Sequence, residues 1–136
     1  MPDSAKLRAL VEAASNVRRN AYSPYSKVKI GAAVLTSKGK VYSGCNVENS
    51  SYGISCCAER NAIFKAVSEG ERSIVAIAVY GESEGFTSPC GACRQVMAEF
   101  NPRMLVLRRG KDGFSEDTTA GALLPSHFNP EGLARR

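Results

Sequence analysis

Two short cysteine motifs place the strongest constraint on how this chain can fold. The first is Cys57-Ala58-Glu59-Arg60, and the second is Pro89-Cys90-Gly91-Ala92-Cys93. Together they supply three thiolates and one carboxylate. Three thiolates can bind a zinc ion and leave its fourth position open for water. A carboxylate that is not a metal ligand can then move protons to and from that water. We therefore expect a fold that brings the two motifs to one point, and we expect an enzyme.

The spacing within each motif predicts where it lies on a helix. Cys90 and Cys93 are three residues apart, so at a helix start they share a face and can bind one ion. Cys57 and Glu59 are two residues apart, which is about 200° around a regular helix. The two side chains can point to one site only if Cys57 lies at the N-terminal end of its helix, where the backbone is not yet regular. Both motifs are thus predicted at helix N-termini, where free N–H groups and the helix dipole favour thiolate over thiol.

The charge of such a site predicts a role for Arg60. Three thiolates around a divalent zinc ion leave a net negative charge, which works against lowering the pKa of the bound water. Arg60 lies one helical turn after Cys57, on the same side, and we expect it to donate hydrogen bonds to the cysteine sulfurs. Glu59 is expected to take a proton from water, pass it to a ring nitrogen and protonate the leaving ammonia, as in zinc-dependent deamination of a nucleobase.

Two other interpretations of the cysteines stay open at this point. A Pro-Cys-x-x-Cys stretch after a strand is also compatible with a redox dithiol. A structural zinc site with four thiolates would need Cys45 or Cys56 as its fourth ligand. The presence of the Cys-Ala-Glu partner favours the catalytic zinc site, and Cys45 and Cys56 are most simply small buried residues.

Composition narrows the class of protein. The chain has 136 residues, enough for a single domain over 1–136, and a net charge of +5 whose basic residues are scattered along the sequence. It has no Trp and no clustered basic stripe, whereas a polynucleotide ligand should come with a basic, aromatic-rich channel. The longest apolar run, Ile74 to Val79, is too short to span a bilayer, and the N-terminus has no apolar signal region. We expect a cytoplasmic protein with neither a nucleic-acid nor a membrane partner.

Hydrophobic periodicity predicts an α/β fold. The expected elements are helices over 4–20, 57–69, 90–100 and 119–124, and strands over 27–36, 40–46, 74–80, 104–107 and 114–117. A helix comes first, then a hairpin, and then strands and helices alternate. This order predicts a three-layer α/β/α sandwich built on a mixed, roughly five-stranded sheet.

The sequence resembles the small cytidine deaminases of pyrimidine salvage from Tyr22 to about Phe128. The segments that carry the resemblance are Tyr22-Ser23-Pro24-Tyr25-Ser26, Gly31-Ala32-Ala33, Gly44-Cys45-Asn46-Val47-Glu48-Asn49, Cys57-Ala58-Glu59-Arg60, Ser88-Pro89-Cys90-Gly91-Ala92-Cys93-Arg94-Gln95 and Leu123-Leu124-Pro125. The related blasticidin deaminases share the zinc motifs but resemble this chain less around Asn46 and Glu48. The resemblance implies hydrolytic deamination of cytidine and 2′-deoxycytidine to uridine and 2′-deoxyuridine, with release of ammonia.

The resemblance also implies roles for individual residues. One zinc ion per chain would be held by Cys57, Cys90 and Cys93, with Glu59 as the proton shuttle. Asn46 and Glu48 would bind the ribose hydroxyls, and the backbone around Ala58 would contact the base. Phe128 would contribute its aromatic side chain to the pocket of a neighbouring subunit. A zinc site made only of cysteines is similar to that of the homotetrameric branch of the family.

One position departs from the family pattern. Residue 28 is Val, where these deaminases usually have a Phe that stacks on or beside the base. The missing ring puts in question how tightly the base is packed and which base analogues are accepted. A deaminase-fold protein acting on nucleic acid, or a binding module with a structural zinc, remains the alternative. The Asn46 and Glu48 pair favours a free nucleoside, whose ribose hydroxyls need recognition.

Overall fold

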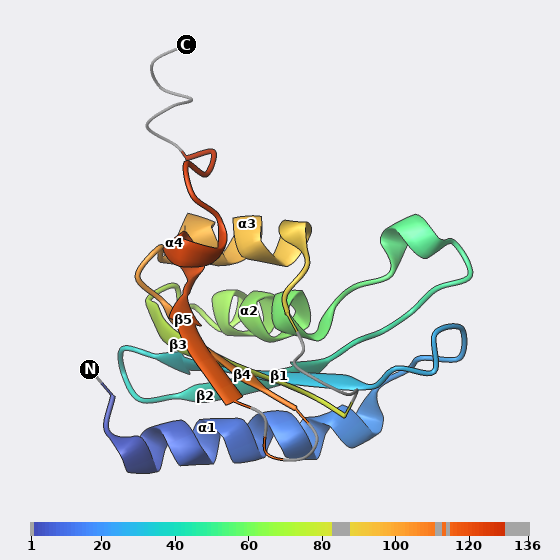
Figure 1. Cartoon of the computed structure of the whole chain (residues 1–136), viewed down its shortest axis with the longest axis horizontal. Coiled ribbons are helices and arrows are strands. Elements are labelled where there is room, and N and C mark those ends of the chain that lie inside the picture. Colours follow the sequence, from blue (N-terminus) through green and yellow to red (C-terminus); the bar gives the residue numbers. More distant parts are fainter. Residues whose placement is uncertain (1, 83–87, 111–112, 114, 130–136) are drawn as a thin grey trace.

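The fold is a mixed five-stranded sheet, seen here in a computed structural model that describes residues 2–82, 88–110, 113 and 115–129. The strands are β1 (Ile30–Thr36), β2 (Val41–Cys45), β3 (Ile74–Gly81), β4 (Leu105–Arg109) and β5 (Ser115–Thr119), and their order across the sheet is β2-β1-β3-β4-β5. Strands β3 and β4 run parallel, while the other neighbouring pairs are antiparallel (Figure 1). The mixed, five-stranded sheet expected from the sequence is therefore confirmed.

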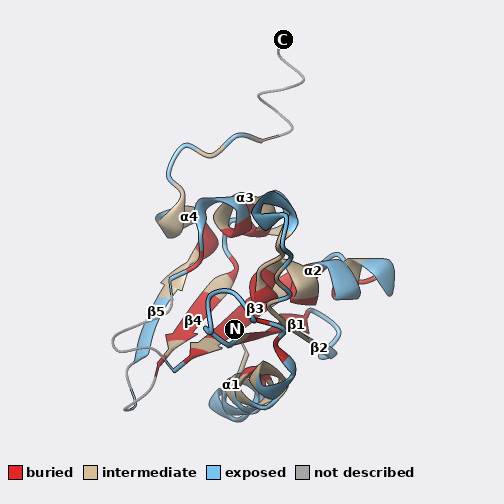
Figure 2. Ribbon diagram, turned by 90° about the vertical axis from the view of Figure 1, so that its right-hand side faces the viewer, coloured by how far each residue is buried: buried red, intermediate tan, exposed pale blue. Residues whose placement is uncertain are grey.

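Helices cover both faces of this sheet. They are α1 (Ser4–Val17), α2 (Ala58–Ser68), α3 (Gly91–Phe100) and α4 (Ala120–Leu123), with short 3₁₀ turns η1 (Arg18–Asn20) and η2 (Tyr52–Ile54). Helix α1 lies along one face, and α2 and α3 lie on the other (Figures 1 and 2). This arrangement is the α/β/α sandwich that the order of elements predicts.

Two apolar layers separate the sheet from its helices. Alternate residues of β1 point to opposite faces, so Ala33 and Leu35 pack in the layer under α1, and Ala32 and Val34 pack in the layer under α2 and α3. Strand β3 is divided in the same way and is almost wholly buried. Burial on both faces explains why its sequence is a continuous apolar run rather than an alternating one.

Two glycines allow the helices to approach the sheet closely. A Cβ atom at Gly31 would lie 1.9 Å from the carbonyl oxygen of Ala14 in α1. A Cβ atom at Gly44 would lie 2.6 Å from the backbone nitrogen of Ala62 in α2. Neither position has room for a side chain. Gly44 therefore sets the distance between β2 and α2, and so the position of the first cysteine motif at the start of α2.

The first strand starts later than its sequence predicts. The strand expected over 27–36 begins at Ile30, because Lys27 has a positive φ of 64° and breaks the extended run. The side-chain amide of Asn46 then takes the place of a neighbouring strand. Its Oδ1 accepts a hydrogen bond from Ile30 N, and its Nδ2 donates to the carbonyl of Val28, both at 2.8 Å.

Several other boundaries also differ from the expected ones. The helix expected over 4–20 ends at Val17 and tightens into η1, and the short turn η2 lies in a segment expected to be a loop. Strand β4 extends to Arg109, and the edge strand expected over 114–117 is observed over Ser115–Thr119, with position 114 outside the described residues.

In the part of the chain that the structure describes, no helix is long and apolar enough to cross a membrane.

Candidate active site

Both cysteine motifs lie at helix N-termini, as their spacing predicts. Cys57 is the N-cap residue of α2 and Cys90 is the N-cap residue of α3, each with extended backbone (φ −71° and ψ 155°, φ −70° and ψ 169°). Cys93 follows in the first turn of α3 and is buried. Because Cys57 precedes the regular helix, it and Glu59 are not held on opposite sides of α2.

The three sulfur atoms are placed at the distances that a metal ion requires. Cys57 Sγ lies 3.7 Å from Cys90 Sγ, which lies 3.5 Å from Cys93 Sγ. A tetrahedral zinc ion with bonds of about 2.3 Å to sulfur holds its ligands about 3.8 Å apart. The three sulfurs lie within 4.8 Å of one another, and among the described residues no fourth ligand group joins them. Cys45 and Cys56 lie outside this cluster, so the site fits three-thiolate rather than four-thiolate zinc.

The cluster loses its first proton readily. The hydrogen bond from the Cys93 thiol, followed by those from Arg60 and Cys90, lowers the pKa of Cys57 to about 5. The hydrogen bond to Cys57, together with burial, raises the pKa of the Cys93 thiol well above its usual range. Arg60 Nη2 donates to Cys57 Sγ at 3.5 Å. One thiolate is thus formed in advance at Cys57, and metal binding releases the remaining protons.

Glu59 is the carboxyl group closest in sequence to this cluster and is buried. Only 4% of the residue is exposed. Burial raises the pKa of Glu59 to about 7, and the neighbouring Cys57 thiolate acts in the same direction. A carboxyl group with a pKa near neutrality can both accept and release a proton under ordinary conditions.

A pocket of about 250 Å³ joins most of the residues that the sequence singles out. Its lining consists of Ser26, Val28, Ile30, Asn46, Glu48, Ser55, Cys56, Cys57, Ala58, Glu59, Ser88 and Cys90. Arg60 and Cys93 do not line it, but both contact the cysteines that do. Phe128 also lies outside this lining. Its carbonyl accepts a hydrogen bond from Gln95 Nε2 on α3, and its side chain is half exposed.

Glu48 binds the backbone of its own chain at the rim of the pocket. Its Oε1 accepts hydrogen bonds from the backbone nitrogens of Tyr25 (3.0 Å) and Ser26 (3.1 Å), and its Oε2 accepts one from the Ser26 hydroxyl. The Ser26 hydroxyl is the main reason that the pKa of Glu48 is lowered, so the carboxylate stays ionised at neutral pH. A carboxylate offers about four acceptor positions, and three are used here. One remains for a donor from a ligand.

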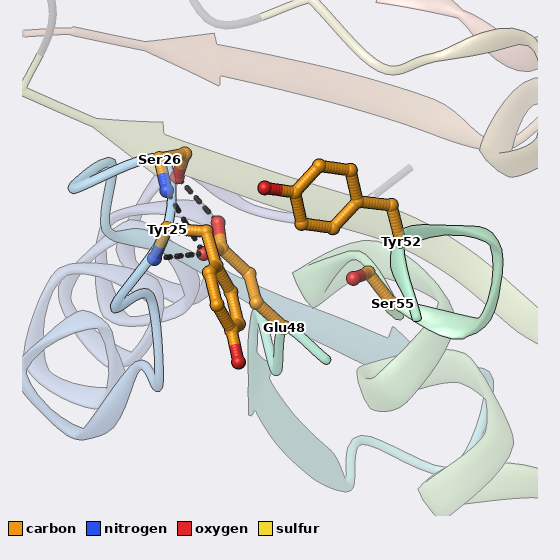
Figure 3. Close-up of a pocket in the computed structure, with 5 residues that line it drawn as sticks. All are labelled: Tyr25, Ser26, Glu48, Tyr52 and Ser55. Carbon is orange, nitrogen blue, oxygen red and sulfur yellow. Dashed lines mark hydrogen bonds between the residues drawn. The ribbon is translucent and has the colours of Figure 1, made fainter. Parts of the chain in front are cut away.

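A second pocket of about 320 Å³ adjoins the first across Glu48 (Figure 3). It is lined by Tyr25, Ser26, Glu48, Tyr52 and Ser55, and the two tyrosine rings meet edge to face with their centroids 5.6 Å apart. No sequence pattern predicts a role for either tyrosine. The Tyr22-Ser23-Pro24-Tyr25-Ser26 stretch was the available signal, but a turn-rich segment does not reveal where its side chains point.

Comparisons with known proteins agree with this geometry. Residues 4–108 match the family described as the cytidine and deoxycytidylate deaminase zinc-binding region. A cytidine deaminase of Sporosarcina psychrophila is 51% identical over 92% of this chain and 93% of its own length. The crystal structure of cytidine deaminase from Burkholderia pseudomallei has a TM-score of 0.87 and 52% identity, covering 89% of this chain and 98% of that chain. That from Mycobacterium tuberculosis has a TM-score of 0.79 and 36% identity, covering 90% and 96%. The chain therefore belongs to the zinc-binding cytidine and deoxycytidylate deaminase family.

Proposed function

We propose that this protein catalyses the zinc-dependent hydrolysis of cytidine and 2′-deoxycytidine to uridine and 2′-deoxyuridine, with release of ammonia. The observation that carries the proposal is a single pocket lined by two cysteines of the three-sulfur cluster, the buried Glu59, and the polar pair Asn46 and Glu48. This pocket combines a metal site, a proton carrier and groups suited to a sugar. Relatives of this chain are named cytidine deaminase.

Cys57, Cys90 and Cys93 would hold one zinc ion per chain. When bound, zinc supplies Lewis acidity that lowers the pKa of a water molecule. Arg60, which donates to Cys57, offsets part of the negative charge of the thiolates. The positive ends of α2 and α3 act in the same direction, because both cysteine motifs lie at helix N-termini.

Glu59 would carry the protons of the reaction. Water adds its oxygen to the ring carbon that bears the exocyclic amine, and Glu59 passes a proton from that water to the ring nitrogen. Glu59 then takes the second proton, from the hydroxyl group now on the ring carbon, and delivers it to the amine, which leaves as ammonia while the hydroxyl oxygen becomes a carbonyl. A pKa of about 7 suits both halves of this task.

The remaining pocket residues would position the nucleoside. Asn46 would donate to the ribose hydroxyls and the ionised Glu48 would accept from them, using the capacity that their bonds to the chain leave unused. The backbone at Ala58, the first residue of α2, would contact the base, with Val28 beside it. Phe128 would contribute its aromatic side chain to the pocket of a neighbouring subunit.

We further propose a single catalytic domain over 1–136 that works as a cytoplasmic homotetramer in pyrimidine salvage, without a nucleic-acid partner. Several large apolar side chains are exposed on and around the loops that carry the pocket, and this supports burial against other subunits. They are Tyr22, Tyr25, Val28, Val47, Tyr52 and Ile54.

The experiment that tests this function follows the ultraviolet absorbance of cytidine with purified protein. We expect conversion to uridine, loss of the activity with a zinc chelator and its return with added zinc. Glu59→Gln should keep one zinc per chain and lose almost all activity. A protein that binds zinc but does not convert cytidine would contradict the proposed substrate. Full activity of Glu59→Gln would contradict the role of Glu59.

A salt titration separates nucleoside from nucleic-acid ligands. Affinity for a polynucleotide falls steeply as salt rises, because counterions are released on binding. KM for cytidine, a neutral molecule, should stay nearly constant over the same range. Tight, salt-sensitive binding of single-stranded DNA or RNA would favour the alternative function.

A further inference from the structure

Among the described residues, Ser88 and Pro89 form no backbone–backbone hydrogen bond outside helices and strands, and Pro89 is buried. Pro89 has no backbone N–H to donate, and Cys90 forms no side-chain cap at the start of α3. The bonds to the two residues before Cys90 therefore help to fix its position, together with the burial of Pro89. Arg94 provides two of these bonds, from Nε to the Pro89 carbonyl (2.8 Å) and from Nη2 to the Ser88 hydroxyl (2.7 Å). Arg108 Nη1 also donates to the Ser88 hydroxyl, at 3.1 Å.

A third bond of Arg94 reaches another part of the fold. Its Nη1 donates to the carbonyl of Leu123, the last residue of α4, at 2.9 Å. Arg94 belongs to the first turns of α3, and its backbone nitrogen donates to the Cys90 carbonyl at 3.0 Å. One planar guanidinium group thus joins the segment before Cys90 and the end of α4 to the helix that carries Cys90 and Cys93.

The acceptors around Arg94 indicate that its shape matters more than its charge. All three are neutral oxygens, and within the described residues Arg94 forms no ion pair with a carboxylate. A guanidinium group presents several N–H donors in a fixed plane, whereas a lysine ammonium group is a single point of charge on a flexible stem. Lysine at this position would keep the charge but could not reach the three oxygens in the same way.

We propose that Arg94 is a positioning residue that holds Cys90 at the sulfur–sulfur distance required for metal binding. It does so by fixing Ser88 and Pro89 relative to the carbonyl of Leu123. Metal sites tolerate deviations of only about 0.2 Å in their bond lengths, so the backbone that carries a ligand must be held closely. The proposal rests on the proposed function in one respect, since it takes Cys90 as a zinc ligand. Arg94 itself does not line the pocket and is not one of the three clustered cysteines, but it binds Ser88 and Cys90, which do line the pocket.

The test compares Arg94→Lys with Arg72→Lys, which makes the same chemical change at an exposed residue away from the pocket. Zinc affinity is measured by competition with a chromophoric chelator. We expect Arg94→Lys to bind zinc about 10-fold to 100-fold more weakly, the range typical of groups that orient metal ligands. Arg72→Lys should match the parent protein. Affinity of Arg94→Lys within twofold of the parent would overturn the proposal.

Two further measurements distinguish positioning from general support of the fold. The absorption spectrum of the cobalt-substituted protein reports ligand geometry, and we expect its bands to shift in Arg94→Lys but not in Arg72→Lys. With excess zinc, kcat for cytidine should fall more than KM changes, because Arg94 does not line the pocket. A variant with an unchanged cobalt spectrum and merely a lower melting temperature would assign Arg94 a structural role and overturn the proposal.

A second variant covers the case in which Arg94→Lys does not fold. Ser88→Ala removes the hydroxyl that accepts from Arg94 and Arg108 but keeps the Arg94 bonds to Pro89 and Leu123. Its zinc affinity should fall by several-fold, and an unchanged affinity would contradict the proposal. These metal-binding results do not depend on cytidine being the substrate. A parent protein that binds zinc without deaminating cytidine would refute the proposed function and leave this comparison intact.

Discussion

The Sγ atoms of Cys57 and Cys90 lie 3.7 Å apart although 33 residues separate them in the sequence. Each cysteine is the last extended residue before a helix, and the two helices pack on the same face of the sheet (Figure 1). The sheet and its packing, rather than the local sequence, therefore bring the two helix N-termini together. The position of the cysteine cluster is therefore set by the positions at which α2 and α3 begin.

Removing one member of this sulfur pair should remove the metal. Cys90→Ala leaves two sulfurs, so we expect zinc content to fall far below one per chain. Turnover should fall by more than about 100-fold. Mutation of a group that only orients a metal ligand lowers metal affinity or activity by about 10-fold to 100-fold, and loss of the ligand itself should cost more. Metal analysis of the purified protein and the cytidine assay provide the measurements. Cys45→Ala is the matched control, because Cys45 lies outside the cluster, and it should keep both zinc and activity. Equal zinc loss in both variants would refute the three-cysteine assignment.

The sequence predicted that the two cysteine motifs meet at helix N-termini because the signal is local and chemical. The two-residue spacing of Cys57 and Glu59 and the three-residue spacing of Cys90 and Cys93 predict a helix start, so the placement of Cys57 and Cys90 followed without knowledge of the fold. Alternating and continuous apolar runs likewise predicted the strands of the central sheet. The helix starts and the strands depend on residues close in sequence, so the sequence alone could predict them.

Other features were missed because they depend on contacts between distant residues. Before β1, the backbone of Val28 and Ile30 binds the Asn46 side chain, which comes from another segment. The three bonds of Arg94 likewise join Ser88, Pro89 and Leu123, and no spacing rule indicates them. Asn46 was expected to bind substrate, and its bonds to the backbone at the start of β1 became visible only in the fold.

Arg60→Ala should lower turnover while zinc remains bound. Arg60 donates to Cys57 and helps to lower its pKa, and its own pKa is raised in return, mainly by the bond to Cys57. Without it, the thiolates keep more negative charge and oppose ionisation of the water. We expect turnover to fall about 10-fold to 100-fold, with zinc content near one per chain. Arg72→Ala serves as the control, and turnover equal to the parent would remove Arg60 from the site.

Gly44→Ala should destabilise the protein through the contact between β2 and α2. The added Cβ would lie 2.6 Å from Ala62 N and 2.9 Å from the Asn61 carbonyl carbon, so the helix backbone has to move. Overpacking of this kind costs about 1–3 kcal/mol, measurable as a lower free energy of unfolding in urea. Gly53→Ala makes the same change where no atom lies within 4 Å, and it should stay within about 0.5 kcal/mol of the parent. Equal stability of the two variants would show that α2 can shift freely.

Glu48→Gln should weaken nucleoside binding because the carboxylate becomes a neutral amide. The pKa of Glu48 is lowered, chiefly by the Ser26 hydroxyl, so the parent carboxylate is ionised throughout the neutral range. KM for cytidine should therefore rise by about 10-fold or more, the loss expected for a hydrogen bond to a charged group. Because the charge state does not change between pH 6 and about pH 9, this ratio should be constant there. Glu99→Gln, an exposed change on α3, is the control and should leave KM unchanged.

The same lowered pKa predicts a pH dependence of stability. The folded protein holds the Glu48 proton less tightly than the unfolded chain, whose glutamates have a pKa of about 4.3. The stabilisation by the carboxylate is thus fully present above that pKa and is lost as pH falls through the lower folded value. The difference in unfolding free energy between parent and Glu48→Gln should be constant above about pH 5 and shrink on acidification. A difference that grows in acid would mean that Ser26 and Tyr25 hold the protonated form more strongly. The carboxylate would then not be the species that fixes this loop.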